Sequence, residues 1–593
     1  MSYKTIPDMF FHSVEKYADN PCLFDKINGV WDGRTYREIG ESVENIACGL
    51  ASLGIKKGDK IAILSTNSSR WAIADYAITG LGAVTVTVYP TLTNPHITYI
   101  CNDSETKYAF VENAEQLDKT QTLVKECKKF KGFIMMDDSE SNMENVIGFS
   151  TLIEKGKTYK KVSGFNFRDH GKSINEDDLL TLIYTSGTTG NPKGAMLSHK
   201  NLVSNVKSGR KAIYVDENDV FLSFLPLSHV YERMAGHFSA FSSGASTYYA
   251  ESVDTVAENM GEVRPTIMIS VPRLYEKMYA RIVDKVNNDS SIKQKIFWWA
   301  IKVGKEATPY LIKQKRPGGI LGLKLGLAEK LVFSKIKEKV GGRLRFFASG
   351  GAPLSKEIAE FFASANILIL EGYGLTETSP VISTNTQENV KFGTVGKPID
   401  GVEVKIAPDG EILCRGDNVM MGYYNNPEAT AEVIDQDNWF YTGDIGEIDD
   451  EGFLRITDRK KNIIVTSGGK NIAPAPMETA LIMSKYIEQS IIIGDKRNFI
   501  SALIVPTMEN VNKWAEDHGL SKDLLNDPKI IQLFENEIKE SMKNFAKFET
   551  VKKFKLIPDE WSVDSGELTP TLKVKRKVVV EKYAELIDSI YKE

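Results

Sequence analysis

The sequence predicts an α/β protein, with a large N-terminal part made of several subdomains and a small α+β part at its C-terminus. Segments with helical and strand patterns alternate in the first part of the chain, and a glycine-rich loop follows one predicted strand. Such alternation is typical of layered folds with a largely parallel sheet. The 593 residues are also too many for one hydrophobic core, which favours several domains.

Hydrophobic periodicity predicts the first elements in order. We expect a helix over 34–52, a strand over 60–64, a helix over 70–80 and a strand over 83–88. The last two segments are strongly apolar but contain Asp75 and several small residues. We therefore interpret them as a buried helix followed by a strand, not as a membrane span.

Composition and charge are those of an ordinary globular protein. Hydrophobic residues make up 42% of the chain and charged residues 26%, and the net charge of −5 gives no general attraction to nucleic acid. Met1–Phe11 lacks the apolar core of a signal peptide. No CxxC pair occurs, so neither a disulfide framework nor a zinc site is indicated, and a cytoplasmic location is the simplest expectation. The five cysteines are Cys22, Cys48, Cys101, Cys127 and Cys414.

The most informative segment is the glycine-rich loop that follows the predicted strand Leu179–Thr185. Its glycines allow backbone N–H groups to approach an anion, its hydroxyls can donate to phosphate oxygens, and Lys193 adds a positive charge. Gly190 is followed by Asn191, so the spacing of a Walker A loop is absent and a P-loop NTPase is disfavoured. The alternative is a glycine-rich surface turn.

Residues 184–199 (YTSGTTGNPKGAMLSH) resemble the signature of the adenylate-forming superfamily, which includes acyl-CoA synthetases, luciferases and peptide-synthetase adenylation domains. In that superfamily the loop holds the β- and γ-phosphates of ATP. The resemblance implies an adenylation domain over 1–458 and a mobile C-terminal domain over 459–593. It implies a metal contact at Thr188. The implied ATP-binding loop residues are Thr185, Ser186, Gly187, Thr188, Thr189, Gly190 and Lys193.

A second segment, 371–380 (EGYGLTETSP), matches another motif of the superfamily. The resemblance implies that Tyr373 stacks on adenine, Thr376 contacts the α-phosphate and Glu377 binds Mg²⁺, which prefers oxygen ligands. Segment 350–354 resembles the lining of the adenine and acyl pockets. Small residues expected to leave room for the nucleotide are Gly351, Ala352, Gly372 and Gly374.

Two further segments complete the expected nucleotide and acyl site. Within 441–444 (YTGD), Asp444 would accept from the ribose hydroxyls, and Arg459 would add a second ribose or phosphate contact. His229, within 225–233 (LPLSHVYER), would lie near the carboxylate end of the acyl pocket. The alternatives are an Asp in a turn and a partly buried His satisfied by hydrogen bonds.

The C-terminal segment supplies the remaining implied residues. Lys573, in 566–573 (GELTPTLK), aligns with the superfamily's catalytic lysine, although taken alone this segment is a basic surface run. Lys461 aligns with the hinge residue. Gly468 and Gly469 would open a path for the pantetheine arm of CoA.

Residues 291–345 form a strongly basic excursion. They hold 14 Lys/Arg and 3 Glu, a local net charge of +11, with apolar residues between the charges. A basic amphipathic helix can lie on an anionic membrane surface, which here would be the inner face of a membrane. The alternative is a helical excursion whose apolar side packs on the body of the protein.

Segments 225–233 and 272–277 resemble the long-chain acyl-CoA synthetase branch. The resemblance implies an AMP-forming fatty-acid–CoA ligase that uses Mg²⁺, ATP and CoA, makes an acyl-AMP intermediate and has no nucleic-acid partner. One alternative is a related ligase for another acid, or one that passes acyl-AMP to a carrier protein. A more distant alternative is a non-catalytic, membrane-associated acyl or nucleotide binder. A homo-oligomer stays open.

Overall fold

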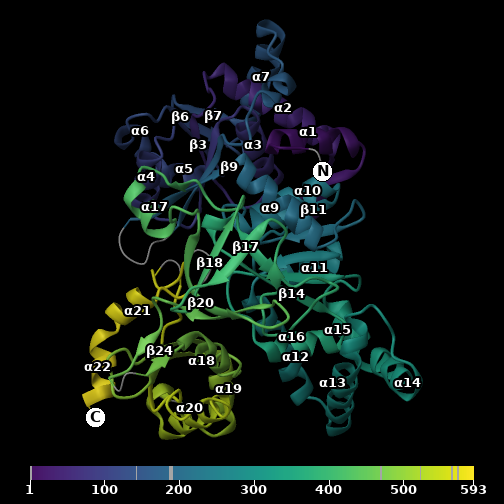
Figure 1. The fold of residues 1–593 in the computed structure, drawn as a ribbon, viewed down its shortest axis with the longest axis vertical. Coiled ribbons are helices and arrows are strands. Elements are labelled where there is room, and N and C mark those ends of the chain that lie inside the picture. Colours follow the sequence, from purple (N-terminus) through teal and green to yellow (C-terminus); the bar gives the residue numbers. More distant parts are fainter. Residues whose placement is uncertain are drawn as a thin grey trace.

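The computed structural model describes residues 3–139, 141, 143–185, 191–467, 470–520, 523–562, 565–569 and 573–592. In Figure 1 the N-terminal elements form the upper part, a green sheet crosses the middle, and the C-terminal elements lie at the lower left. A group of helices from the middle of the sequence projects at the lower right.

An eight-stranded sheet carries the strand that precedes the glycine-rich loop. Its central strands are parallel, whereas β9 is antiparallel to β8 and so returns the chain directly after that loop. In spatial order its eight strands are β19 (Gly422–Tyr423), β9 (Lys193–Ser198), β8 (Leu179–Thr185), β4 (Val84–Val88), β3 (Lys60–Leu64), β5 (Tyr108–Val111), β6 (Gly132–Met135) and β7 (Val146–Gly148).

A nine-stranded sheet forms the second large layer. Its central strands β11, β10, β12, β13 and β14 are parallel, with antiparallel strands at both edges. In spatial order its strands are β16 (Lys397–Pro398), β15 (Val381–Thr384), β14 (Leu368–Gly374), β13 (Phe346–Ser349), β12 (Ile267–Ser270), β10 (Val220–Ser223), β11 (Ser246–Tyr249), β1 (Pro21–Ile27) and β2 (Val30–Thr35).

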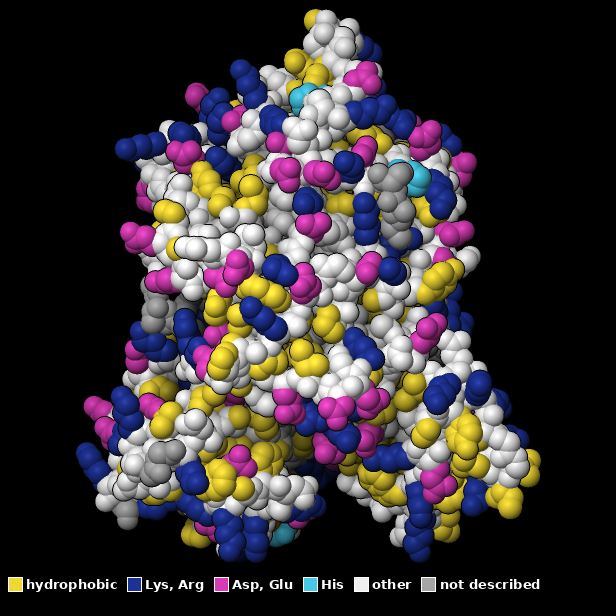
Figure 2. Space-filling view, in the orientation of Figure 1, with side chains coloured by type: hydrophobic (Ala, Val, Ile, Leu, Met, Phe, Trp, Pro, Cys, Tyr) yellow, Lys and Arg dark blue, Asp and Glu magenta, His cyan; other side chains and the backbone are white. Residues whose placement is uncertain are grey.

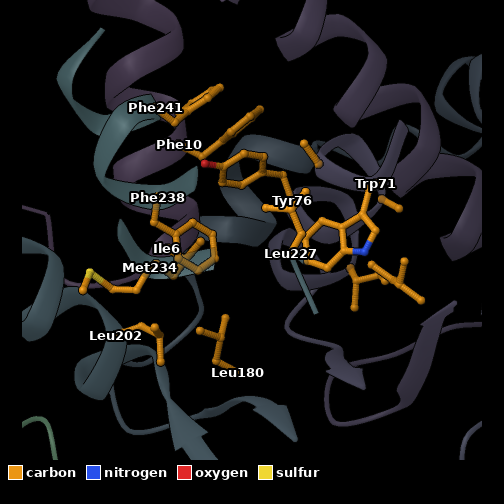
Figure 3. Packing of buried hydrophobic residues seen from close by; sticks show 14 of the residues in the cluster. Ile6, Phe10, Trp71, Tyr76, Leu180, Leu202, Leu227, Met234, Phe238 and Phe241 are labelled. Atoms are coloured by element: carbon orange, nitrogen blue, oxygen red, sulfur yellow. The ribbon is translucent and has the colours of Figure 1, made fainter. Parts of the chain in front are cut away.

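Helices between the two sheets share one aromatic core. Figure 3 shows Phe10, Tyr76, Phe238 and Phe241 packed together, and Phe10 stacks on Phe241 with ring centroids 5.4 Å apart. Because these side chains come from four separate elements, burying them fixes the N-terminal helices against the second sheet. The elements are α1 (Ile6–Lys16), α3 (Ser69–Gly80), the π-helix η1 (Glu232–Phe238) and α10 (Ser239–Ser243).

Further helices pack against the sheets and against one another. Those before the glycine-rich loop are α2 (Tyr36–Ser52), α4 (Asn94–Asp103), α5 (Ala114–Thr120), α6 (Leu123–Glu126), α7 (Phe149–Ser163) and α8 (Phe167–Lys172). Those after it are α9 (His199–Ala212), α11 (Val256–Val263), α16 (Lys356–Ser364) and the short 3₁₀ turn η3 (Thr376–Thr378).

The basic excursion is helical. It follows α12 (Pro272–Asn287) and contains α13 (Ser291–Leu311), α14 (Gly319–Ala328), the π-helix η2 (Glu329–Phe333) and α15 (Ser334–Lys339). Its buried residues, including Phe297, Leu325 and Phe333, join the hydrophobic cluster of α16 and the second sheet. No helix within the described ranges is both long enough and apolar enough to cross a membrane.

A four-stranded antiparallel sheet links the large part of the protein to the C-terminal part. Its strands are β17 (Val402–Ile406), β18 (Glu411–Gly416), β20 (Phe440–Ile448) and β21 (Leu454–Arg459), with α17 (Pro427–Val433) beside them. Residues 460–462 form a turn directly after β21. Arg459 therefore still belongs to this sheet.

The C-terminal part has hydrophobic clusters of its own. Both clusters contain only residues from Ile464 onward, as expected for a small unit that folds around its own core. It contains β22 (Ile464–Val465), β23 (Asn471–Ile472), α18 (Pro474–Leu481), β24 (Ile487–Ile493), β25 (Ser501–Pro506) and α19 (Met508–Asp517). It ends with η4 (Leu524–Asn526), α20 (Pro528–Ser541), β26 (Lys553–Leu556), α21 (Arg576–Lys582) and α22 (Ala584–Lys592).

The early elements match the sequence expectations closely, with one correction. The helix expected from residue 34 begins at Tyr36, because Val30–Thr35 pairs with β1. A turn at Asn28 and Gly29, both with positive φ, closes this hairpin, and an Asn-Gly pair favours that conformation. Thr35 then caps α2 through its hydroxyl and Glu38. All five cysteines are free and buried, in agreement with the expectation of no disulfide.

Candidate active site

One large open cavity, of about 3100 Å³, lies between the large N-terminal part and the C-terminal part. Every site residue expected from the sequence that the structure describes borders this cavity. They are Thr185, Lys193, His229, Gly351, Ala352, Gly372, Tyr373, Gly374, Thr376, Glu377, Asp444, Arg459, Lys461 and Lys573. The expected residues Ser186, Gly187, Thr188, Thr189, Gly190, Gly468 and Gly469 lie outside the described residues.

The residues that flank the expected phosphate loop lie on two antiparallel strands, β8 and β9. Thr185 at the end of β8 is in register with Lys193 at the start of β9, so the loop between them leaves and re-enters the sheet at one point. The Lys193 ammonium lies 5.1 Å from the centre of the Tyr423 ring. The Tyr423 hydroxyl donates to Glu377 Oε1 at 2.8 Å. Tyr423 thus connects the loop lysine to the expected metal ligand.

Glu377 lies in the η3 turn just beyond β14, and its side chain is buried. The turn is held close to the strand, since a Cβ at Gly374 would lie 1.8 Å from the Pro380 carbonyl oxygen. Within the described part of the chain, no group of three or more His, Cys, Asp or Glu side chains could hold a metal. A single carboxylate suits Mg²⁺ bound mainly through nucleotide phosphates, so the residues present fit that ion.

Tyr373, Asp444 and Arg459, the residues expected to bind adenosine, contact one another. The Tyr373 hydroxyl donates to Asp444 Oδ2 at 2.7 Å, and Arg459 Nε lies 3.3 Å from Asp444 Oδ1. Asp444 and Arg459 are opposite each other in the β20–β21 ladder. Burial raises the pKa of Asp444, while Arg459 and the Tyr373 hydroxyl oppose that shift. The arrangement presents a buried carboxylate and an exposed guanidinium to one region of the cavity.

Lys573 reaches the same region from the far end of the chain. Its backbone N–H donates to Thr569 Oγ1 at 3.1 Å, and the Thr569 N–H donates to the Lys573 carbonyl at 2.8 Å. Burial lowers the pKa of Lys573 to about 8; Arg459 also lowers it, and Asp444 raises it. Its ammonium group is therefore close to the groups expected to hold the ribose and phosphate.

His229 borders the same cavity from the segment that follows β10. Its Nδ1 accepts from the Tyr231 N–H at 3.2 Å. Burial, with a smaller contribution from the Lys573 charge, lowers the pKa of His229 to about 3, so its imidazole is neutral near pH 7.

Sequence reasoning missed two residues that shape this site, Tyr423 and Asn67. Asn67 clamps the segment before His229: it donates to the Leu225 carbonyl at 2.7 Å and accepts from the Leu227 N–H at 2.8 Å. Tyr423 belongs to the short edge strand β19, far from Glu377 in sequence. Neither residue lies in a recognisable motif, so only the folded structure reveals these contacts.

Two sequence profiles match this chain. The profile of AMP-binding enzymes matches residues 10–424, and that of the AMP-binding enzyme C-terminal domain matches 461–593. A long-chain-fatty-acid–CoA ligase of Mycobacterium bovis is 36% identical over 95% of this chain and 93% of its own length. A chloroplastic long-chain-fatty-acid–[acyl-carrier-protein] ligase of Arabidopsis thaliana is 30% identical over 99% of this chain and 87% of its own length.

Solved structures give the same fold. An anthranilate CoA ligase bound to anthranoyl-AMP aligns with a TM-score of 0.74, over 99% of this chain and 98% of its own, at 18% identity. The fold and the site together define a nucleotide-binding enzyme of the adenylate-forming class, which confirms the fold class expected from the sequence. The chain belongs to the family of AMP-binding enzymes.

Proposed function

We propose that this chain is an AMP-forming long-chain fatty-acid–CoA ligase. The observation that carries the proposal is that nucleotide-type polar groups and a long apolar wall border the same cavity. The apolar wall comes from β10, β12, β13 and β14 of the nine-stranded sheet. Its members are Phe221, Ile267, Ile269, Phe346, Ala348 and Leu370.

Tyr231 packs against this apolar wall, and His229 borders the same cavity. Ile213 borders the cavity directly after α9, and Met234 and Ala235 border it from η1. A hydrocarbon chain placed there would leave water for an apolar surface, which favours binding by about 0.8 kcal/mol for each buried CH₂. The carboxylate would then be at the polar end, near Lys573.

In the first half-reaction a carboxylate oxygen attacks the α-phosphorus of ATP, the bond to the bridging oxygen breaks, and pyrophosphate leaves. Such a displacement depends mainly on positioning and on stabilising the developing charge. We assign the adenosine to Tyr373, Asp444 and Arg459, and charge stabilisation to Lys573 and Thr376. Mg²⁺ held by Glu377 and the phosphates would neutralise phosphate charge.

In the second half-reaction a thiol attacks the same acyl carbon. The CoA thiol loses its proton as its sulfur bonds to the carbonyl carbon, the bond from that carbon to the phosphate oxygen of AMP breaks, and AMP leaves. We propose that the domain over 459–593 rotates about Lys461, so that Lys573 leaves and the segment with Gly468 and Gly469 approaches. Lys461 lies in an exposed turn, as such a hinge requires.

The present arrangement corresponds to the first half-reaction, because Lys573 is already in the cavity. Two groups of contacts hold it. Arg273 on α12 forms an ion pair with Glu488 on β24 and donates to the Glu488 carbonyl at 3.0 Å. Lys485 in the C-terminal part lies 3.8 Å from Asp284, also on α12. These ion pairs must break when the domain rotates.

Lys573 makes the first half-reaction sensitive to pH. Its protonated form is the active one, and its pKa is lowered to about 8, so we expect kcat/KM for ATP in pyrophosphate exchange to fall as pH rises through about 8. Lys573→Arg, whose guanidinium stays protonated, should lack this decline at whatever activity it retains. A flat profile between pH 7 and 9 in the wild-type protein would contradict the assigned role.

Acid-dependent ATP–pyrophosphate exchange tests the substrate class. We expect exchange with saturated acids of about 12 to 18 carbons and little with acetate or benzoate, because a short acid leaves the apolar wall uncovered. CoA should yield the thioester without a carrier protein. Exchange confined to aromatic or short acids, or acyl transfer only to a carrier protein, would favour the related ligases instead. If no acid supported exchange, the remaining alternative would be a non-catalytic protein that binds acyl groups or nucleotides.

The partners that follow from this proposal are a fatty acid, ATP and CoA. A long-chain acid partitions into bilayers, so a membrane surface is the natural source of the substrate. We propose that the basic excursion over 291–345 makes peripheral contact with such a surface.

A further inference from the structure

Helix α14 and the following η2 carry two apolar stripes, and only one of them is covered. The inner stripe packs into the hydrophobic cluster that includes α13 and α16, through Leu325, Ala328, Val332 and Phe333. The outer stripe faces water. Its members and their exposed fractions are Ile320 at 74%, Leu323 at 75%, Leu327 at 55% and Leu331 at 45%.

The spacing of these four residues makes them a ridge. Successive members are three or four positions apart, so they fall on one face of the helix. We call Ile320, Leu323, Leu327 and Leu331 the α14 ridge. Scattered exposed leucines are common on protein surfaces, but four in a row on one helical face are not. In Figure 1 α14 lies at the outer end of the lower-right projection, and Figure 2 shows exposed hydrophobic side chains among blue ones there.

Positive charge surrounds the ridge. Lys324 and Lys330 are exposed, and within the described residues neither forms an ion pair. At about 100° per residue, Lys324 projects beside Ile320 and Leu327, next to the apolar face. The excursion as a whole carries +11, whereas the complete chain carries −5. An apolar face bordered by lysines fits the boundary between anionic headgroups and acyl chains.

A second copy of the chain fits this surface poorly. Two ridges placed face to face would bring the lysines of both copies together. Four side chains also offer far less than the roughly 800 Å² per partner that a stable interface buries. A membrane accepts a small apolar ridge and supplies the opposite charge.

We infer that the α14 ridge enters the headgroup region of an anionic membrane, with the neighbouring lysines on lipid phosphates. Burial of the inner stripe holds α14 against the body of the protein, so insertion needs no unfolding of this helix. The inference deepens the proposed function by naming the element that contacts the membrane supplying the fatty acid. Binding to vesicles does not require catalysis, so the two proposals can fail separately.

Vesicle flotation of the full-length protein tests the inference. Vesicles of equal parts phosphatidylglycerol and phosphatidylcholine should bind the wild-type protein at low salt, and pure phosphatidylcholine vesicles should bind it much less. The variant Ile320→Gln/Leu323→Gln/Leu327→Gln should lose at least about tenfold in partitioning. Lys324→Gln/Lys330→Gln should lose roughly fivefold per lysine, and this loss should shrink at high salt.

The matched control replaces three exposed aliphatic side chains elsewhere, as Ile27→Gln/Val30→Gln/Val162→Gln. It should bind vesicles as the wild-type protein does. AMP release with dodecanoate in solution should be the same in all variants, since none of these residues borders the cavity. If none of the proteins, including the wild type, released AMP, that result would count against the proposed function and not against membrane binding. Three results would overturn the inference. The ridge variant could bind vesicles as the wild type does, the wild-type protein could fail to bind anionic vesicles, or the ridge substitutions could change only the oligomeric state.

Discussion

Replacing Lys573 with Ala should reduce acyl-AMP formation by about 10²–10³-fold while leaving the second half-reaction nearly unchanged. The Lys573 ammonium lies close enough to Asp444 and Arg459 for both charges to shift its pKa. Its loss removes stabilisation of charge that develops at the α-phosphate. Pyrophosphate exchange with palmitate measures the first half-reaction, and single-turnover conversion of supplied palmitoyl-AMP with CoA measures the second.

The neighbouring Lys575→Ala serves as a matched control. Lys575 lies two residues further along the same segment and also borders the cavity, but no role is assigned to it. It should keep both half-reactions within a few-fold of the wild type. An equal loss of both half-reactions in Lys573→Ala would show that Lys573 supports the site as a whole, and the proposed domain rotation would lose its main argument.

The second large effect concerns stability. Asp75→Ala should lower the free energy of unfolding by about 3–5 kcal/mol, because it leaves the Arg233 charge buried without its partner. Arg233 is 1% exposed and Asp75 0%. Arg233 Nε donates to Asp75 Oδ2 at 2.8 Å, and Arg233 Nη1 donates to Thr181 Oγ1 at 2.7 Å. Urea denaturation followed by tryptophan fluorescence measures the change.

Arg233 also connects two elements that border the cavity. Thr181 lies on β8, which leads into the glycine-rich loop, and Arg233 follows His229 by one helical turn. The double variant Asp75→Leu/Arg233→Met should be less destabilised than Asp75→Ala, since no charge stays buried alone. Asp289→Ala, which breaks an exposed pair with Lys293, should leave the denaturation midpoint unchanged. Equal effects of Asp75→Ala and Asp289→Ala would contradict this explanation.

Local patterns were enough to predict much of the fold. The strands at Lys60–Leu64 and Leu179–Thr185 coincide with the predicted ones, because buried parallel strands consist of continuous apolar runs. The Asn28–Gly29 turn was a readable hairpin signal that the helix prediction from residue 34 overlooked. Sheet order was not predictable, since it depends on packing between elements that are distant in sequence.

Site residues within motifs could be predicted as a set, whereas their partners could not. Lys193, Glu377, Asp444 and Lys573 all border the cavity as the resemblance implied, and their assigned roles stay predictions. Tyr423, whose hydroxyl donates a hydrogen bond to Glu377, lies in no motif that the sequence would identify. The exposed face of α14 also escaped prediction, because periodicity alone cannot tell which of two apolar stripes is covered.

The most direct test of the central claim is AMP release from ATP with palmitate, measured with and without CoA. The proposed function predicts steady AMP release only when CoA is present, with one palmitoyl-CoA formed for each AMP. Without CoA, pyrophosphate should appear in an amount close to that of the enzyme. Steady AMP release without CoA, or CoA-independent ADP formation, would contradict a two-step ligase that carries acyl-AMP from one half-reaction to the next.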